Sequence, residues 1–327
     1  MNRPKRIQTF VSFSLALIYH ASAYGLDVDM KNRILEQRSC KACKLSGESL
    51  EGLDLTYVSF ENADLTGAKL AGRNLSHASF KGANLLGADL SGANLSEADF
   101  SDAKMQSAKL VGANISGAQL ADTDMQKADV RDANFKGARL NGTKLSHALI
   151  GGAKLQQASF FMADLSFTDL RQQNFAGVDL TSCILKGTLL EGVNFTRANL
   201  DGADLRASRM RGAQLREAIL NDSLMQGVQL QDAQLVRASM MSARLDKADL
   251  TGADLSRVNA LGASFRNTKI QQTIFLDAEL SQTRFSQAII QGSRFQGASV
   301  CDTDLPAQAK KEGYCEEAGF VTDVDDL

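Results

Sequence analysis

Cysteines near both ends of the chain are the residues whose spacing most suggests chemistry. Cys40 and Cys43 form a Cys-x-x-Cys motif. As a redox motif it requires a thioredoxin-like βαβ setting, which the surrounding sequence lacks. As half of a zinc site it lacks a second ligand pair at useful spacing. The motif therefore predicts a local disulfide or a plain capping role.

The other three cysteines are Cys183, Cys301 and Cys315. Cys301 and Cys315 flank a segment that contains Pro306, and a disulfide between them would tie this tail down as a cap. Cys183 occupies a position that is otherwise mostly Ala, so we expect a buried free thiol there. Disulfides persist in the periplasm or outside the cell. The disulfides predicted for Cys40 with Cys43 and for Cys301 with Cys315 therefore depend on where the chain resides.

Histidines and carboxylates give no support for catalysis. His77 and His147 are many residues apart, and His20 lies in the N-terminal apolar segment. Glycines recur with the turns of a repeat and form no phosphate loop between a strand and a helix. We therefore expect no catalytic residues, no cofactor and no metal. We also expect no pocket of the depth that small-molecule sites need.

A five-residue period positions all of these side chains. From Leu50 to Leu305 every fifth residue is large and apolar, except Ala260, and the residue two positions earlier is mostly Ala. A helix would scatter the apolar column over all its faces and would place many glycines in its interior, at about 1 kcal/mol each. The period therefore excludes a helical reading.

A short extended side followed by a turn fits the period. Ala63 and Leu65 would point to one face while Asp64 points outward, and Thr66-Gly67 would turn the corner. Four such sides make a square coil of about 20 residues, and stacked coils pair their backbones at about 4.8 Å. The same stacking aligns outward amides that can bond along the stack, namely Asn74, Asn94, Asn114 and Asn134.

Residues 83–92 contain the motif Ala-(Asp/Asn)-Leu-x-x twice, as Ala83-Asn84-Leu85-Leu86-Gly87 and Ala88-Asp89-Leu90-Ser91-Gly92. This motif resembles the pentapeptide-repeat family, and the resemblance covers about residues 45 to 305. It implies an all-β fold, the right-handed quadrilateral parallel β-helix of that solenoid family. It implies little about activity, because a fold does not name a function.

Four segments follow from these patterns. Residues 1–23 resemble a signal peptide, with a basic start, a short apolar run and Ala21-Ser22-Ala23 as cleavage site. Residues 24–44 form the N-terminal cap, residues 45–305 the β-helix, and residues 306–327 the C-terminal cap with an acidic tail. We expect a cleaved, exported, periplasmic chain without a transmembrane span; a retained N-terminal anchor is the alternative.

Short helices are expected to cover the strand edges that a stack exposes at its ends. One is predicted over Val28–Gln37, with Asp27 as its N-cap and Met30, Ile34 and Leu35 on its apolar side. A second is predicted after Pro306. The sequence is compatible both with a single rod and with homo-oligomers joined through these end caps.

The charge distribution argues against a nucleic-acid role. Some proteins of the resembled family protect DNA gyrase by imitating duplex DNA through a strongly acidic surface. Here residues 44–200 carry 17 acidic and 15 basic side chains, and residues 201–300 carry 10 and 12. A phosphate mimic needs a sustained negative field, so a topoisomerase-protecting DNA mimic is the alternative hypothesis and nucleic-acid binding is not expected.

Departures from the repeat are the places where a specific function could lie. Arg73 stands where Ala is usual, with Glu48 as a candidate partner or with its side chain turned outward. Six consecutive small positions hold other residues, which predicts a wider or bent stack. Apolar residues also occupy outward positions nearby. The run is Thr168, Gln173, Val178, Cys183, Thr188 and Val193, and the outward residues are Leu149, Phe161, Met162, Phe167, Ile184 and Leu189.

These outward residues form a candidate surface for an unknown protein partner. Scattered surface apolar residues are the ordinary alternative. The function predicted from the sequence is a non-catalytic, exported structural or protein-interaction solenoid that presents a rigid flat surface. An enzyme or sugar-binding solenoid is a third hypothesis.

Overall fold

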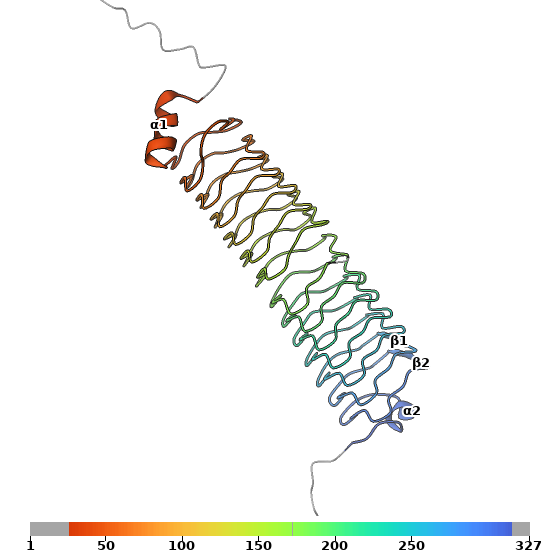
Figure 1. Ribbon diagram of the computed structural model, residues 1–327. Helices are drawn as coiled ribbons and strands as arrows, with labels where there is room; N and C mark the ends of the chain where they lie inside the picture. Colours follow the sequence, from red (N-terminus) through yellow and green to blue (C-terminus); the bar gives the residue numbers. More distant parts are fainter. Residues whose placement is uncertain (1–25, 172, 316–327) are drawn as a thin grey trace, which may run out of the picture.

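The chain winds into coils that stack along one axis. The computed structural model describes residues 26–171 and 173–315, and within them the chain is a right-handed, four-sided parallel β-helix. Figure 1 shows an elongated rod with helix α1 (Val28–Gln37) at one end and helix α2 (Ala307–Lys310) at the other. The fold class predicted from the five-residue period is confirmed. The signal segment predicted for residues 1–23 lies outside the described residues, as do residues 316–327 of the tail.

Backbone hydrogen bonds join each coil to the next. Asp64 pairs in parallel with Asn84, one coil of 20 residues later. Across this pair Leu65 N donates to Asn84 O at 2.7 Å, and Asn84 N donates to Ala63 O at 2.9 Å. Most sides are too short to count as strands. Two that do are β1 (Lys269–Gln271) and β2 (Ile289–Gln291), which pair in parallel.

The backbone conformation at the corners explains which residue types occupy the turns. Ala68 N donates to Leu65 O at 2.9 Å, which closes each corner over three residues. The second corner residue has a left-handed backbone, with φ of 62° at Gly67 and 58° at His77. Gly adopts this conformation without strain, whereas other residues do so at some cost.

The core is a narrow tube of large side chains lined by small ones. Phenylalanines at the repeat centres are fully buried and stack from coil to coil, with ring centroids 5.1 Å apart for Phe60 and Phe80. Some Ala positions hold Thr, whose hydroxyl then bonds to the preceding coil, as Thr143 Oγ1 does to Leu120 O at 2.7 Å. The predicted amide ladder is present, with bonds of 3.0–3.1 Å along Asn74, Asn94, Asn114 and Asn134.

Helix α1 covers the first coil. Asp27 caps it by accepting a hydrogen bond from Asp29 N at 3.0 Å, and Ile34 is fully buried beneath it. Leu35, expected on the buried side, is instead 44% exposed. An ion pair of 2.7 Å between Arg38 and Asp54 fixes the end of the helix to the stack.

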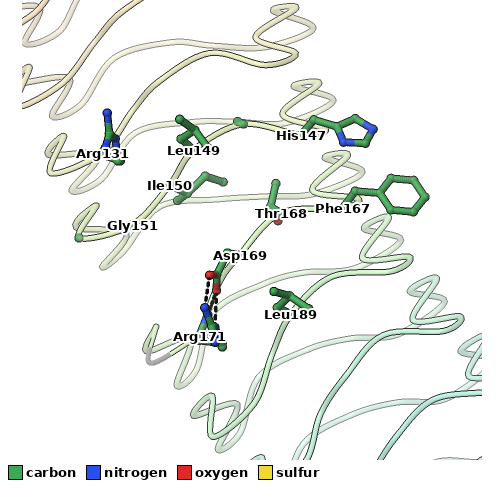
Figure 2. Close-up of a pocket in the computed structure, with 12 residues that line it drawn as sticks. Arg131, His147, Leu149, Ile150, Gly151, Phe167, Thr168, Asp169, Arg171 and Leu189 are labelled. Atoms are coloured by element: carbon green, nitrogen blue, oxygen red, sulfur yellow. Dashed lines mark hydrogen bonds and ion pairs between the residues drawn. The ribbon is translucent and has the colours of Figure 1, made fainter.

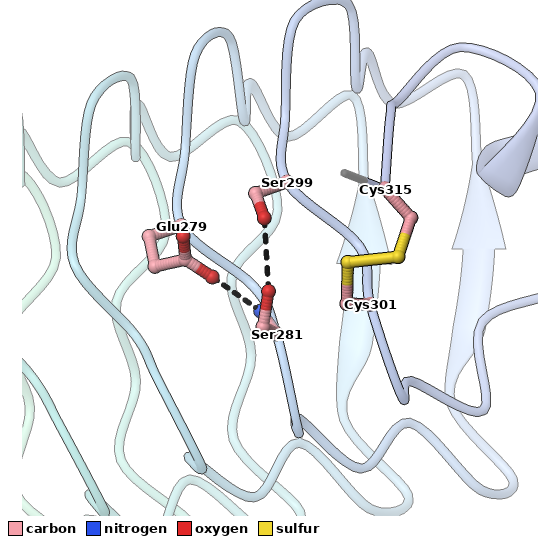
Figure 3. Close-up of a disulfide and its surroundings, with 5 residues drawn as sticks. All are labelled: Glu279, Ser281, Ser299, Cys301 and Cys315. Carbon is pink, nitrogen blue, oxygen red and sulfur yellow. Dashed lines mark hydrogen bonds between the residues drawn. A yellow bond between two sulfur atoms is a disulfide. The ribbon is translucent and has the colours of Figure 1, made fainter. Parts of the chain in front are cut away.

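The last coil is closed by a returning tail. Tyr314 pairs in parallel with Ser299, and Val300 N donates to Tyr314 O at 2.9 Å. Figure 3 shows the disulfide between Cys301 and Cys315 that holds this tail beside the last coils. No helix within the described residues is long and apolar enough to cross a membrane.

Candidate functional site

The backbone ladder is interrupted in the middle of the rod. Among the described residues, 149–158 form sides that match 169–171 and 173–178 of the next coil, yet the parallel pairs expected between them are not formed. Within the described chain the N–H groups of Ile150, Gly152 and Leu155 have no hydrogen-bond acceptor. We call this opening between the two coils the seam.

One side of the square remains joined across the seam. Asp164 pairs with Lys144 before it and with Ile184 after it. On the adjoining side the contact is partial, since Phe160 N still reaches Asp179 O at 3.3 Å. The coils therefore spread apart as a wedge whose closed edge is the side that contains Asp164.

The opening coincides with three consecutive small positions that hold larger residues. Ala148, Ala153 and Ala158 line one coil, whereas Thr168, Gln173 and Val178 take the matching positions in the next. Interiors near crystal density do not accept added volume without strain. The sides that contain Thr168, Gln173 and Val178 are the ones whose parallel pairs to the preceding coil are lost.

The Thr168 hydroxyl donates within its own coil, to Leu165 O at 2.6 Å, as the Thr283 hydroxyl does to Leu280 O in a paired part of the stack, whereas Thr143 and Thr188 bond to the preceding coil. The run of enlarged positions was predicted to widen or bend the stack. The structure localises the change to the first half of that run, because the coils at Thr188 and Val193 remain paired.

A pocket of about 710 Å³ opens at the seam. Figure 2 shows Leu149, Ile150 and Gly151 on one coil, Thr168 and Asp169 on the next, and the neighbouring side chains around them. The sequence predicts no pocket of the depth that small-molecule sites need, and this open hollow lies where the stacking of the coils is interrupted. The repeat pattern predicts evenly spaced coils with flat sides, and this even spacing is lost at the seam.

Two ion pairs frame the pocket. Arg171 bonds Asp169 through Nε at 2.9 Å and through a terminal nitrogen at 2.7 Å, and Arg131 bonds Asp129 in the same bidentate way. These bonds hold the pKa of each carboxyl below its usual range, and the pKa of each guanidinium above it. Since both arginines already have a carboxylate partner, the pocket has little unpaired charge for an ionic ligand.

The predicted apolar surface lies around the seam. Five of its residues are between 39% and 56% exposed, and Leu189 is half-buried. Three of the six, Leu149, Phe167 and Leu189, line the pocket itself. The Phe167 ring stacks on His147 with centroids 5.0 Å apart. The other three residues of this set are Phe161, Met162 and Ile184.

The remaining candidate residues lie far from the seam or in the core. Cys40 and Cys43 form a disulfide, and Cys183 is a buried free thiol whose Sγ donates to Phe160 O at 2.7 Å. Its burial raises the pKa of the Cys183 thiol to about 12. Among residues 26–171 and 173–315, no group of three His, Cys, Asp or Glu side chains is placed to hold a metal ion.

Arg73 does not meet Glu48. Its guanidinium lies 3.6 Å from Glu51, and its side chain is 29% exposed. The Nε is buried without a hydrogen-bond partner. Of the two alternatives drawn from the sequence, the structure has the outward-turned side chain, which extends toward Glu51 at the corner.

Sequence reasoning missed Gly151 and the backbone groups of the seam. Gly151-Gly152 is a pair of glycines in a corner, and an added Cβ at Gly151 would meet no atom within 4 Å. The unpaired backbone groups depend on which coils face each other, and only the Thr168–Val178 positions pointed toward them.

Comparison with known proteins matches most of the chain to one protein family. Profiles described as "pentapeptide repeat region" and "pentapeptide repeats (8 copies)" match residues 53–130 and residues 138–172, 174–212, 208–246 and 238–275, together more than half of the chain. A comparison with curated protein sequences found no match.

Similar solved structures include HetL, a pentapeptide repeat protein involved in heterocyst differentiation regulation from the cyanobacterium Nostoc. It is 24% identical, with 73% of this chain and 93% of that chain covered and a TM-score of 0.25. A pentapeptide repeat protein from the Arabidopsis thaliana thylakoid lumen is 27% identical over 34% of this chain and 73% of its own, with a TM-score of 0.20. QnrB1, a plasmid-mediated fluoroquinolone resistance protein, is 14% identical over 84% and 97%, with a TM-score of 0.25.

Proposed function

Because the chain belongs to the pentapeptide-repeat family, we propose that it is a non-catalytic, exported scaffold that holds a partner protein against its apolar surface. The observation that carries this proposal is that the apolar residues Leu149, Phe167 and Leu189 together line the pocket at the seam. Apolar patches on a soluble surface are typical of protein-interaction sites. Coils bonded above and below the seam would keep these side chains in a fixed arrangement.

Export is supported by the cysteines. The structure holds the disulfides Cys40–Cys43 and Cys301–Cys315 at the two ends of the stack. Disulfides persist in oxidising compartments and are rare in the cytosol. The signal-like residues 1–23 are consistent with the same destination. Fractionation of expressing cells tests it: a mature chain beginning near Tyr24 in the periplasmic fraction supports export, and a full-length cytosolic chain contradicts it.

The DNA-mimic alternative finds no support in the charges of the rod. Acidic side chains along its faces are frequently paired with arginines, as Glu217 is with Arg197 at 2.8 Å and Asp204 is with Arg206 at 2.6 Å. Paired carboxylates contribute little to the sustained negative field that a phosphate mimic needs. The scaffold proposal is therefore the one that the surface supports better.

Partner capture tests the scaffold proposal. Crosslinking in intact cells followed by mass spectrometry should recover the same partner with the wild type and with a control that removes exposed apolar residues elsewhere, Ile219→Ser plus Leu261→Ser. Phe167→Ser plus Leu189→Ser should lose that partner, since apolar contact area is lost. Recovery of one set of partners with all three proteins would remove the proposal.

A further inference from the structure

The two edges of the seam present complementary backbone groups. On the first edge, residues 148–152, the N–H groups of Ile150 and Gly152 have no acceptor within the described chain. Among the described residues, the N–H of Asp169 on the second edge has no acceptor, and no N–H donates to the carbonyls of Asp169 and Arg171. On the first edge Ala148 O also receives no N–H within the described chain, so each edge offers both donors and acceptors toward the same opening.

The same groups are paired where the stack is intact. Two coils earlier, Leu110 N donates to Asp129 O at 2.7 Å and Gly112 N donates to Arg131 O at 2.9 Å. At the seam these groups face an open pocket, so each can hydrogen-bond to an added strand without breaking a bond within the described chain. The seam thus resembles a sheet from which one strand is missing, with free edges on both sides.

The walls of the opening indicate what fits between these edges. Leu149, Ile150 and Leu189 supply apolar surface, and Gly151 leaves open space where other corners carry a side chain. The guanidiniums of Arg131 and Arg171 are already bound by Asp129 and Asp169. These pairs offset the charge at the pocket, which favours an uncharged ligand with alternating donors and acceptors.

We propose that the seam binds an extended segment of a partner polypeptide as an added β-strand. Its backbone hydrogen-bonds to Ile150 and Gly152 on one edge and to Asp169 and Arg171 on the other, and an apolar side chain packs on Leu149 and Leu189. Strand addition of this kind takes its affinity from main-chain bonds and its specificity from side-chain pockets. This inference rests on the proposed scaffold function and specifies how the partner is held.

A synthetic peptide with the sequence of residues 86–93, LGADLSGA, is a suitable probe. In the intact stack this segment forms the same side of an earlier coil, with Asp89 N donating to Ala68 O at 2.9 Å and Leu90 N donating to Lys109 O at 2.7 Å. The control peptide carries N-methyl groups at the residues equivalent to Asp89 and Leu90, which removes both donors and keeps every side chain.

Binding is measured by fluorescence anisotropy of the labelled peptides on the full chain, and by hydrogen exchange of individual amides. We expect the methylated peptide to bind at least 10-fold more weakly. We also expect the unmethylated peptide to slow exchange at Ile150, Gly152 and Asp169 by at least 10-fold. A peptide that does not bind at millimolar concentration, or that binds equally with and without N-methyl groups, overturns the proposal.

A matched pair of variants locates the peptide. Gly151→Trp places an indole at the rim of the pocket. The substitution causes no left-handed backbone strain, because φ at Gly151 is not positive. Val111→Trp makes the same change at the equivalent corner two coils earlier. The first variant should abolish peptide binding and the second should preserve it; equal binding by both places the peptide elsewhere and overturns the seam as its site.

The outcomes separate this inference from the scaffold proposal. If the peptide binds in the seam while cellular partners are indifferent to Phe167 and Leu189, the scaffold proposal fails and the strand site stands. If partner capture depends on those residues while N-methylation has no effect on the peptide, the strand site fails and the scaffold proposal stands.

Discussion

At the scale of single residues, Cys183 shows how a core position controls stability at high pH. Its thiol is fully buried and donates to Phe160 O, and burial raises the pKa of Cys183 from 9.0 to about 12. In the unfolded chain the thiol ionises near pH 9, whereas the folded chain keeps it neutral. The stability that this group contributes is therefore full below about pH 9 and is lost as the pH rises toward 12.

The comparison with Cys183→Ala measures this effect. Unfolding free energies from denaturant titrations between pH 8 and pH 11 should fall faster for the wild type than for the variant, since other titrating groups are common to both. Ala is the usual residue at this position, so the variant should fold normally. Parallel pH profiles for the two proteins would show that Cys183 does not ionise on unfolding in this range.

At the scale of elements, the C-terminal cap depends on one disulfide. The returning tail pairs Tyr314 with Ser299 and is joined to the last coils by Cys301–Cys315. A disulfide that closes a loop of about 15 residues contributes roughly 3 kcal/mol in the chain-entropy account. In a solenoid each coil contacts only its neighbours, so the loss of this bond should remain local.

Hydrogen exchange of Cys301→Ser plus Cys315→Ser tests the cap. The amides of Val300 and Tyr314 should exchange faster than in the wild type, while those of interior coils such as Leu230 should not change. Uniform acceleration along the rod would contradict local capping, and unchanged exchange at Tyr314 would show that the backbone pairing alone holds the tail.

How much of this architecture could be predicted differs between elements. The apolar column at Leu65 and its equivalents determines inward and outward positions, so the coil and the Asn74–Asn134 ladder follow from pattern alone. Helix α1 could be predicted from Asp27 as its N-cap and from the apolar residues along one of its sides. These features are local or repeat at a fixed spacing, and no knowledge of distant contacts is needed to find them.

The seam could be predicted only in part. The enlarged positions from Thr168 to Val193 pointed to the right region, yet Thr188 and Val193 lie on paired coils. A Thr in a small position does not by itself open the stack, since Thr143 lies on a paired coil whereas Thr168 lies at the seam. This depends on how neighbouring side chains share volume, which the repeat pattern does not encode.

At the scale of the whole molecule, the seam divides the rod into two stacks. Stability in a solenoid is approximately a sum of coil terms and nearest-neighbour interface terms. The interface between the coils at 149–158 and 169–178 lacks backbone pairs that other interior interfaces have, and its core residues are slightly exposed, as Val178 is at 8%. Coupling between the two stacks should therefore be weaker than coupling within either one.

Weak coupling predicts that the two stacks unfold in separate steps. Denaturant titration of the wild type should show two transitions, and site-resolved hydrogen exchange should give different opening free energies for amides before and after the seam. Gln173→Ala plus Val178→Ala restores the usual small residues, so it should close the seam and merge the transitions. Val228→Ala, in a paired coil, is the control and should leave two transitions in place. A single transition in the wild type would mean that the side containing Asp164 couples the stacks as strongly as a complete coil interface. In that case the seam would be a local opening in one cooperative rod.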